Sequence, residues 1–412
     1  MAKTNPIITI YICLVGFALS GNFIVFQDNG LRLLDILMVA GAPLFLVLLA
    51  TRTFAPAFLW VLFVIGYFLI FALRGGMEDD SSLIFASVRS ILAIMAGCAV
   101  GTFLAEKPRR MRLFCLVAGI GALCVAWIAL GQLLYRTPFY TDFLPEEAKM
   151  FWYDGRVRAT GIWEHPNSLG QMQAIGTMLA MSLVFIPDVS RFMKVLGAVL
   201  FIATILITYS TTQTRAYLLA STICLILAMN TVAGKRMRVW SQLCFLLGLV
   251  IFPFFARDLL GERWFGETSA GQTALSQAGE RLITKFDSFA LSTSNPIGYG
   301  FQGRLEAQLA LNGKTTASHD AILSFMLTFG VPMGLLIICV LIACFRRITL
   351  HSTWPHPLFL SLVGMLIMFQ FEDSLFSPSM MMLLSITFFT VFGPVLHTRG
   401  QRASGAVKRA MA

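Results

Sequence analysis

Long apolar runs recur along the whole sequence and constrain its fold more than any other feature. Each run approaches the length of about 20 residues that an α-helix needs to cross the hydrocarbon core of a bilayer. Of the 412 residues, 57% are hydrophobic and 13% are charged, whereas soluble domains are roughly half apolar and a quarter charged. The sequence therefore predicts an all-α, polytopic membrane protein.

We expect about twelve transmembrane helices in a single integral membrane domain over residues 1–412. The first run is too long for the apolar region of a signal peptide, and no small-residue cleavage site follows it. The expected spans are 7–26, 31–50, 55–73, 82–104, 113–135, 161–186, 195–210, 216–233, 239–256, 319–345, 354–371 and 376–396.

Lysine and arginine gather in alternate connections between these spans. Cytoplasmic loops of membrane proteins are enriched in both residues, so both termini are expected in the cytoplasm. The alternation also accounts for the net charge of +10 without a nucleic-acid partner. The basic segments are 107–112, 191–194, 235–238, 346–347 and the cytoplasmic tail 397–412.

The two longest connections, 136–160 and 257–318, are expected on the opposite, outer side. Both contain aromatic residues, which argues against disorder, and long connections in compact proteins are often functional. Within the second, residues 274–291 carry apolar side chains at helical spacing, with Arg281 and Lys285 on another face. This pattern predicts an amphipathic helix that lies on the outer membrane surface or covers the end of the bundle.

Five polar sequences are expected to meet at this outer face. By contrast, the spans hold few charged groups, and Asp35 and Arg89 near their outer ends are expected to form a structural ion pair. The five sequences are RVRATGIWEHPNSLGQ (156–171), STTQTRAYL (210–218), GERLITKF (279–286), NPIGYGFQGR (295–304) and SHDAI (318–322).

Arginines that converge at a membrane surface suit phosphate, because the guanidinium fork donates paired hydrogen bonds and keeps its charge. Several of them suit a diphosphate leaving group, whose negative charge they stabilise as it develops. A neighbouring histidine could accept the proton of an attacking hydroxyl, since imidazole titrates near neutral pH. The outer face therefore has the groups needed to transfer a substituent from a lipid diphosphate.

Each of these features also has a structural interpretation. Arginines at a membrane edge often contact lipid headgroups. His165, before Pro166 and Asn167, fits the start of a helix, and Asp320 fits a first helical turn. The NPIGYG sequence fits a simple turn.

All eight cysteines lie inside the apolar runs. No Cys-x-x-Cys motif or Cys/His cluster is present, which argues against disulfides and against a metal site. We expect these cysteines to pack as small apolar side chains between helices.

Over roughly residues 150–345, the order of GIWEHPNSLG, TQTRAYLLA, GERLITKF, NPIGYGFQGR and SHDAILSFMLTFGVPMG resembles the O-antigen ligase and polysaccharide polymerase superfamily. The resemblance implies a GT-C-like glycosyltransferase of the bacterial inner membrane that needs no cofactor or metal. Members take a glycan from undecaprenyl diphosphate on the periplasmic side and pass it to an acceptor glycolipid. The acceptor is lipid A core for a ligase and another lipid-linked repeat unit for a polymerase.

The resemblance also implies roles for individual residues. His319 corresponds to the catalytic histidine, and Arg215, Arg281 and Arg158 to diphosphate-binding arginines, in a single inverting displacement. Thr214 stands before Arg215, where many relatives have serine. The supporting residues are expected to be Asp320, His165, Asn167, Glu280 and Arg304.

Two alternatives remain open from the sequence. Its motifs do not distinguish a ligase from a polymerase, because the residues of the acceptor site cannot be identified from the sequence. A lipid-linked oligosaccharide flippase or another polytopic transporter also has about twelve spans, but its function requires polar groups along a path through the middle of the membrane.

Overall fold

The structure of the protein is a computed structural model that describes the following parts of the chain. The described residues are 6–21, 24–26, 31–51, 56–135, 151–153, 156–160, 162, 166–186, 189–212, 214–232, 283–312, 320–351, 357–369 and 377–392. The predicted span 239–256 and the tail 397–412 lie outside them, as do parts of both long connections.

The described chain is mostly helical, with two short antiparallel hairpins formed by β1 with β2 and by β3 with β4. Residues 283–294 and Pro378–Phe392 are also helical. The elements are α1 (Pro6–Ser20), β1 (Ile24–Phe26), β2 (Leu31–Arg32), α2 (Leu33–Thr51), α3 (Pro56–Met77), α4 (Ser81–Glu106), α5 (Pro108–Tyr135), β3 (Phe151–Tyr153), β4 (Arg156–Arg158), α6 (Pro166–Phe185), α7 (Arg191–Thr212), α8 (Arg215–Val232), α11 (Gly300–Asn312), α12 (Ala321–Phe329), α13 (Val331–His351) and α14 (Phe359–Phe369).

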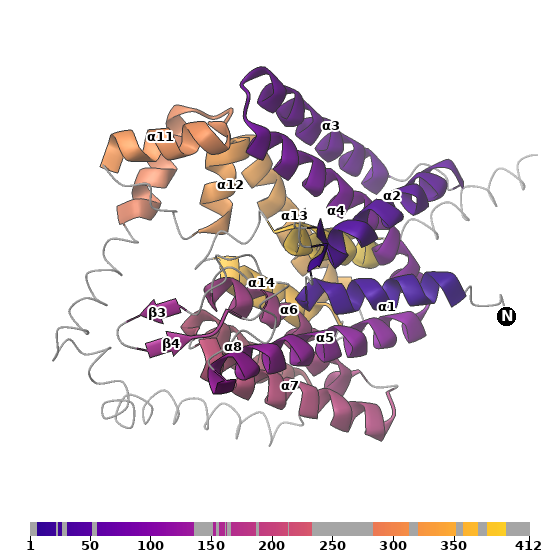
Figure 1. Ribbon diagram of the computed structural model, residues 1–412. Coiled ribbons are helices and arrows are strands. Elements are labelled where there is room, and N and C mark those ends of the chain that lie inside the picture. The colour runs from indigo at the N-terminus through magenta and orange to yellow at the C-terminus, as the bar shows by residue number, and fades with distance from the viewer. Residues whose placement is uncertain are drawn as a thin grey trace, which may run out of the picture.

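The long helices pack in two groups (Figure 1). In the first group, α4 lies between α2 and α3. In the second, α6 contacts α1, α5, α7, α8 and α14. Residues 169–183 of α6 are therefore buried without interruption, and this helix forms the centre of the second group.

Six of the described helices are long and apolar enough to cross a membrane: α2, α3, α4, α5, α7 and α13. Four shorter apolar helices accompany them, at Pro6–Ser20, Tyr217–Leu227, Phe359–Phe369 and Pro378–Phe392. The prediction of an α-helical, multi-pass membrane protein is confirmed, and the number of twelve spans stays a prediction.

The helix α7 is longer than its apolar run. The sequence predicts a span at 195–210, whereas α7 covers Arg191–Thr212. At its C-terminal end, the hydroxyls of Thr211 and Thr212 donate to the carbonyls of Ile207 and Thr208. Polar side chains that bond back to the helix in this way remain compatible with it beyond the apolar segment.

The predicted span 319–345 is wrong as a single helix, because the chain breaks at Gly330. This residue has φ +90°, in the left-handed region that favours glycine. A Cβ placed on Gly334 would collide with the side chain of Met326. Residues eight apart in a continuous helix would be about 12 Å apart, so α12 and α13 meet at a sharp bend.

The helix at 283–294 tests the predicted amphipathic segment 274–291, whose first half lies outside the described residues. Its apolar side chains Ile283, Phe286 and Phe289 are exposed, whereas Ser288 and Ser292 are buried. The apolar face therefore points away from the protein, as expected for a helix that rests on a membrane surface.

The predicted ion pair between Asp35 and Arg89 is confirmed. Arg89 Nη2 lies 2.5 Å from Asp35 Oδ2, and the guanidinium lies 4.4 Å from the ring centre of Phe85. The same carboxylate oxygen accepts from the backbone N–H of Arg32. The pair joins α2 to α4, which supports the structural role expected for it.

Candidate functional site

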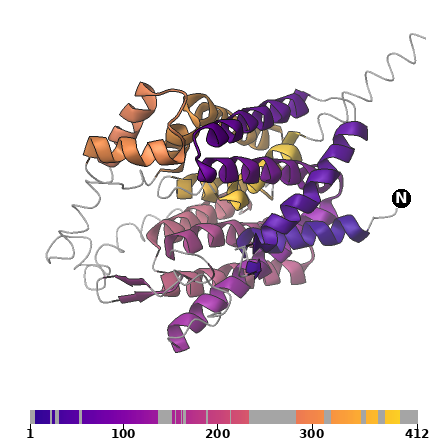
Figure 2. The same ribbon diagram turned by 45° about the horizontal axis from the view of Figure 1, so that its top comes forward.

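Several of the predicted polar sequences lie at one end of the helices. Figures 1 and 2 both place the β3–β4 hairpin and α11 at the end opposite the N-terminus. The first residues of α6 and α8 and the last residues of α7 belong to this end as well, as the contacts below show. We call this region the loop end of the bundle.

The β3–β4 hairpin is attached to the turn between α7 and α8. The backbone N–H of Ala159 donates to the carbonyl of Thr211 at 3.0 Å. Ala159 and Thr160 are fully buried here. This bond brings the backbone of Arg158, at the end of β4, close to the turn that precedes Arg215.

The start of α6 packs against the same turn. A Cβ placed on Gly170 would lie 2.9 Å from the Cβ of Thr214, so only glycine allows this close approach. Thr214 directly precedes α8, which begins at Arg215. Arg158, Arg215 and the first turn of α6, which contains Asn167, are therefore neighbours by their backbones.

Polar side chains are buried beside this junction. Thr177 of α6 and Tyr217 of α8 are fully buried and hydrogen-bond through their hydroxyls at 2.9 Å. Gln173, one turn earlier, is also fully buried. Thr160 Oγ1, Gln171 Nε2, and Gln173 Nε2 and Oε1 have no hydrogen-bond partner among the described residues. Buried polar atoms of this kind are usually satisfied by water or a ligand.

Asp320 connects the start of α12 to the helix at 283–294. Its Oδ1 accepts from the backbone N–H groups of Ile322 and Leu323 at 3.1 and 3.0 Å, which makes it the N-cap of α12. Its Oδ2 lies 3.3 Å from Lys285 Nζ. The expectation that Asp320 belongs to a helix start is confirmed, and its ion pair with Lys285 was not predicted.

The NPIGYG sequence forms a turn that closes the break at Gly330. Tyr299 N–H donates to the carbonyl of Leu327, and Val331 N–H donates to the carbonyl of Pro296. Tyr67 of α3 donates its hydroxyl to the carbonyl of Phe329. Backbone groups exposed by the break are thus paired, so the turn has a structural role.

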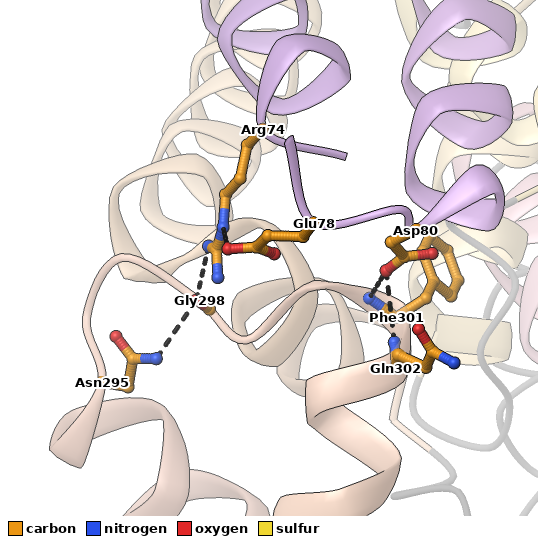
Figure 3. A network of polar contacts seen from close by, with 7 residues as sticks. All are labelled: Arg74, Glu78, Asp80, Asn295, Gly298, Phe301 and Gln302. Carbon is orange, nitrogen blue, oxygen red and sulfur yellow. Dashed lines mark hydrogen bonds and ion pairs between the residues drawn. The ribbon is translucent and has the colours of Figure 1, made fainter. Parts of the chain in front are cut away.

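Figure 3 shows how the α3–α4 turn fixes this segment. Asp80 Oδ1 accepts from Leu83 N–H at 3.0 Å, while its Oδ2 accepts from the N–H groups of Phe301 and Gln302 at 3.1 and 3.3 Å. One buried carboxylate therefore caps both α4 and α11, whose chain positions are more than 200 residues apart.

Arg74 completes the network in Figure 3. Its Nη1 donates to the carbonyl of Gly298 at 2.8 Å, and its Nε donates to Glu78 at 2.8 Å. Asn295 donates to the same carbonyl of Gly298. We call Arg74, Asp80 and their partners at 295–302 the anchor network.

The structure describes some predicted site residues with their side chains, some by their backbones only, and others not at all. Asp320 and Arg304 are described in full, and Arg304 on α11 lies with its guanidinium 5.6 Å from the ring centre of Phe301. Arg158, Asn167 and Arg215 are located by their backbones. The residues outside the described part of the chain are His165, Glu280, Arg281 and His319.

Within the described residues, no group of three or more His, Cys, Asp or Glu side chains could hold a metal ion. The apolar helices define a multi-pass membrane protein with a polar loop end. No protein-family model matches the chain, and no curated protein is significantly similar to it.

Three features were missed by the sequence analysis although each had a local signal. Asp-Gly between FWY and RVR is the typical two-residue connection of a β-hairpin. Asp80 before two serines fits an N-cap. Gln171 and Gln173 are polar residues within an apolar run, which marks such residues as candidates for function in a membrane protein.

Proposed function

We propose that the protein is a glycosyltransferase that acts at the periplasmic face of the bacterial inner membrane. It moves a glycan from undecaprenyl diphosphate to a sugar hydroxyl of an acceptor glycolipid, as an O-antigen ligase or a polysaccharide polymerase. One observation carries this proposal: the Ala159–Thr211 bond and the Gly170–Thr214 contact bring the polar sequences 156–171 and 210–218 together at one junction.

The chemistry follows from the residues assigned to this end. His319, directly before Asp320, takes the proton of the acceptor hydroxyl, and the hydroxyl oxygen attacks the anomeric carbon. The bond between that carbon and the diphosphate oxygen breaks in the same step, with inversion. Arg215, Arg281 and Arg158 stabilise the charge on the departing undecaprenyl diphosphate, and no metal or other cofactor takes part.

The buried Gln171 and Gln173 add neutral hydrogen-bonding groups to α6 where it packs against α8. Amide groups donate to and accept from hydroxyls, which suits a sugar. These residues lie in the first eight positions of α6, or within about 12 Å of its start. Their position near the loop end favours a site at the membrane surface over a path through its middle.

The test is deletion of the gene followed by analysis of surface polysaccharide. Polymer that is made but not attached to lipid A core would identify a ligase, and accumulation of single repeat units would identify a polymerase. Repeat units retained on the cytoplasmic side would favour the flippase and contradict the proposal.

Point variants then test the site in the complemented strain. His319→Ala, Arg281→Ala and Arg215→Ala should each abolish transfer without reducing the amount of membrane-inserted protein. Arg191→Ala is the matched control, because Arg191 begins α7 at the opposite end of the bundle from Arg215. Normal transfer by the Arg215 or His319 variant, or equal loss in the control, would contradict the proposal.

A further inference from the structure

A groove about 340 Å³ in volume lies between α12, α13 and α14. Six of its seven lining residues are apolar: Ile338, Leu341, Ile342 and Phe345 of α13, with Ile322 of α12 and Leu366 of α14. The seventh is Arg346. We propose that this groove binds one acyl chain of an anionic phospholipid, whose phosphate contacts Arg346.

The position of the groove fits one leaflet of a bilayer. Gly330 lies against residues 296–298 near the α3–α4 turn, so α13 runs from the loop end toward the opposite end. Arg346 lies eight residues beyond Ile338, or about 12 Å along the helix. Half of the roughly 30 Å hydrocarbon core is about 15 Å, so the groove has the depth of one chain region.

The apolar lining excludes most other occupants. Ile342 is 59% exposed although it lines the groove, so the space opens toward the surroundings of the helices. An unfilled apolar space would lose dispersion contacts along its walls. A helix about 10 Å wide would need on the order of 900 Å³ over the same 12 Å, whereas a single acyl chain is much thinner.

Charge determines which end of the groove holds the headgroup. Arg346 lies at one end, and a guanidinium at the membrane interface binds phosphate. The other six lining residues are apolar, so none of them offers a phosphate a second cation. A lipid with its phosphate at Arg346 is therefore favoured over a lipid diphosphate that enters from the loop end.

The purified full-length chain provides the test, by native mass spectrometry and thermal unfolding with added phosphatidylglycerol or phosphatidylcholine. We expect one phosphatidylglycerol retained per chain and a rise in Tm that phosphatidylcholine does not produce. Arg346→Gln should weaken phosphatidylglycerol binding about fivefold, and Arg346→Lys should retain most of it. Arg347→Gln is the matched control, since Arg347 does not line the groove.

A second pair of variants tests the chain rather than the headgroup. Ile342→Trp fills the groove and should abolish retention, whereas Leu335→Trp changes an exposed residue of the same helix that does not line the groove. A phosphatidylglycerol with a photoactivatable group in its chain should label residues 338–346 in the unchanged protein and in the Leu335 variant only.

Three outcomes would overturn the proposal. Equal retention of phosphatidylcholine would show that the headgroup charge does not matter. Equal losses in the Arg346 and Arg347 variants would reduce the effect to general surface charge. The third outcome combines two results: an isoprenoid diphosphate displaces phosphatidylglycerol, and Arg346→Gln leaves the labelling of residues 338–346 unchanged. Together they would show that the groove binds a lipid that enters from the loop end.

Discussion

The loop end of the bundle has two sides, and the anchor network on one side differs from the start of α6 on the other in how polar groups are satisfied. Outside the anchor network, Gln308 of α11 also has buried amide atoms without a partner among the described residues. Beside α3 and α4, the anchor network uses both carboxylate oxygens of Asp80 and two nitrogens of Arg74, with donor–acceptor distances of 2.8–3.3 Å. Beside α6, α7 and α8, the amide atoms of Gln173 are buried without a partner among the described residues.

This difference separates a structural role from a candidate binding role. Saturated networks rigidify a fold and leave no hydrogen-bonding capacity for a ligand. Buried amides without partners cost free energy unless something else satisfies them. The anchor network therefore holds the loop segments in place, and the α6–α8 side has the capacity to bind a hydroxyl-rich ligand.

The largest effect is expected where the anchor segment meets the helix break. In Gly330→Ala, the new Cβ would lie 2.7 Å from the carbonyl oxygens of Pro296 and Ile297, at a φ of +90°. We expect a loss of roughly 3–5 kcal/mol from strain and overpacking, measured by denaturant unfolding in detergent.

The control for this variant is Gly66→Ala, in the interior of α3. A Cβ on Gly66 would have no heavy atom within 4 Å, so alanine should stabilise the helix by about 0.5–1 kcal/mol. Similar unfolding free energies for the Gly330 and Gly66 variants would show that the packed break does not exist in solution.

Hydropathy predicted most helices but not the break, and the reason is physical. Apolar runs reveal which residues need a lipid or protein environment, so α2, α4 and α8 begin and end within a few residues of their predicted bounds. The sequence LTFGVPMG is apolar throughout, and a bend in the backbone leaves the hydropathy of a sequence unchanged. The Gly330–Pro332 spacing was the available signal, since glycine ends helices and proline favours a first turn.

The two sides of the loop end were predictable to different degrees. The polar sequences at 156–171 and 210–218 could be assigned to one membrane face by counting spans, and the structure brings their backbones together. The bond between Asp80 and the start of α11 joins segments 221 residues apart. No local pattern encodes such a pairing, because it depends on how the helices pack.

The next effect tests the anchor network through Asp80. Asp80→Ala removes the side-chain acceptor for three backbone N–H groups on two helices, so we expect a loss of about 2–3 kcal/mol. Asp80→Asn keeps one acceptor oxygen and should lose about half as much. Hydrogen exchange should accelerate at residues 300–312 in both variants.

The exchange pattern also tells whether Asp80 is an anchor or part of a binding site. If Asp80→Asn retained slow exchange at α11 but lost transfer activity, the network would belong to the binding site instead. The division between the two sides of the loop end would then be wrong.

A smaller effect is expected on the α6 side, where the substitution should not lower the unfolding free energy as the Asp80 variants do. Gln173→Leu removes two buried amide atoms without partners and should leave the unfolding free energy unchanged or raise it by about 1 kcal/mol. If the amide binds the sugar, transfer should fall about tenfold. Glycan transfer in membranes, normalised to the amount of folded protein, measures this.

Thr177→Val is the matched control for Gln173→Leu, because it lies one turn further along α6. It removes the hydroxyl bond to Tyr217 and should cost about 1 kcal/mol of stability while leaving transfer near normal. Unchanged transfer in Gln173→Leu would leave both sides of the loop end purely structural.

The smallest effect concerns the ion pair between Asp35 and Arg89, which lies in the α2–α4 group. Each single alanine variant leaves a partly buried charge without its partner, whereas the double variant removes both charges. The double variant should therefore be about 1 kcal/mol more stable than the less stable single variant. If the stability lost by the double variant equals the sum of the losses in the two single variants, the two side chains act independently. The α2–α4 group would then contain charged side chains whose role is not structural.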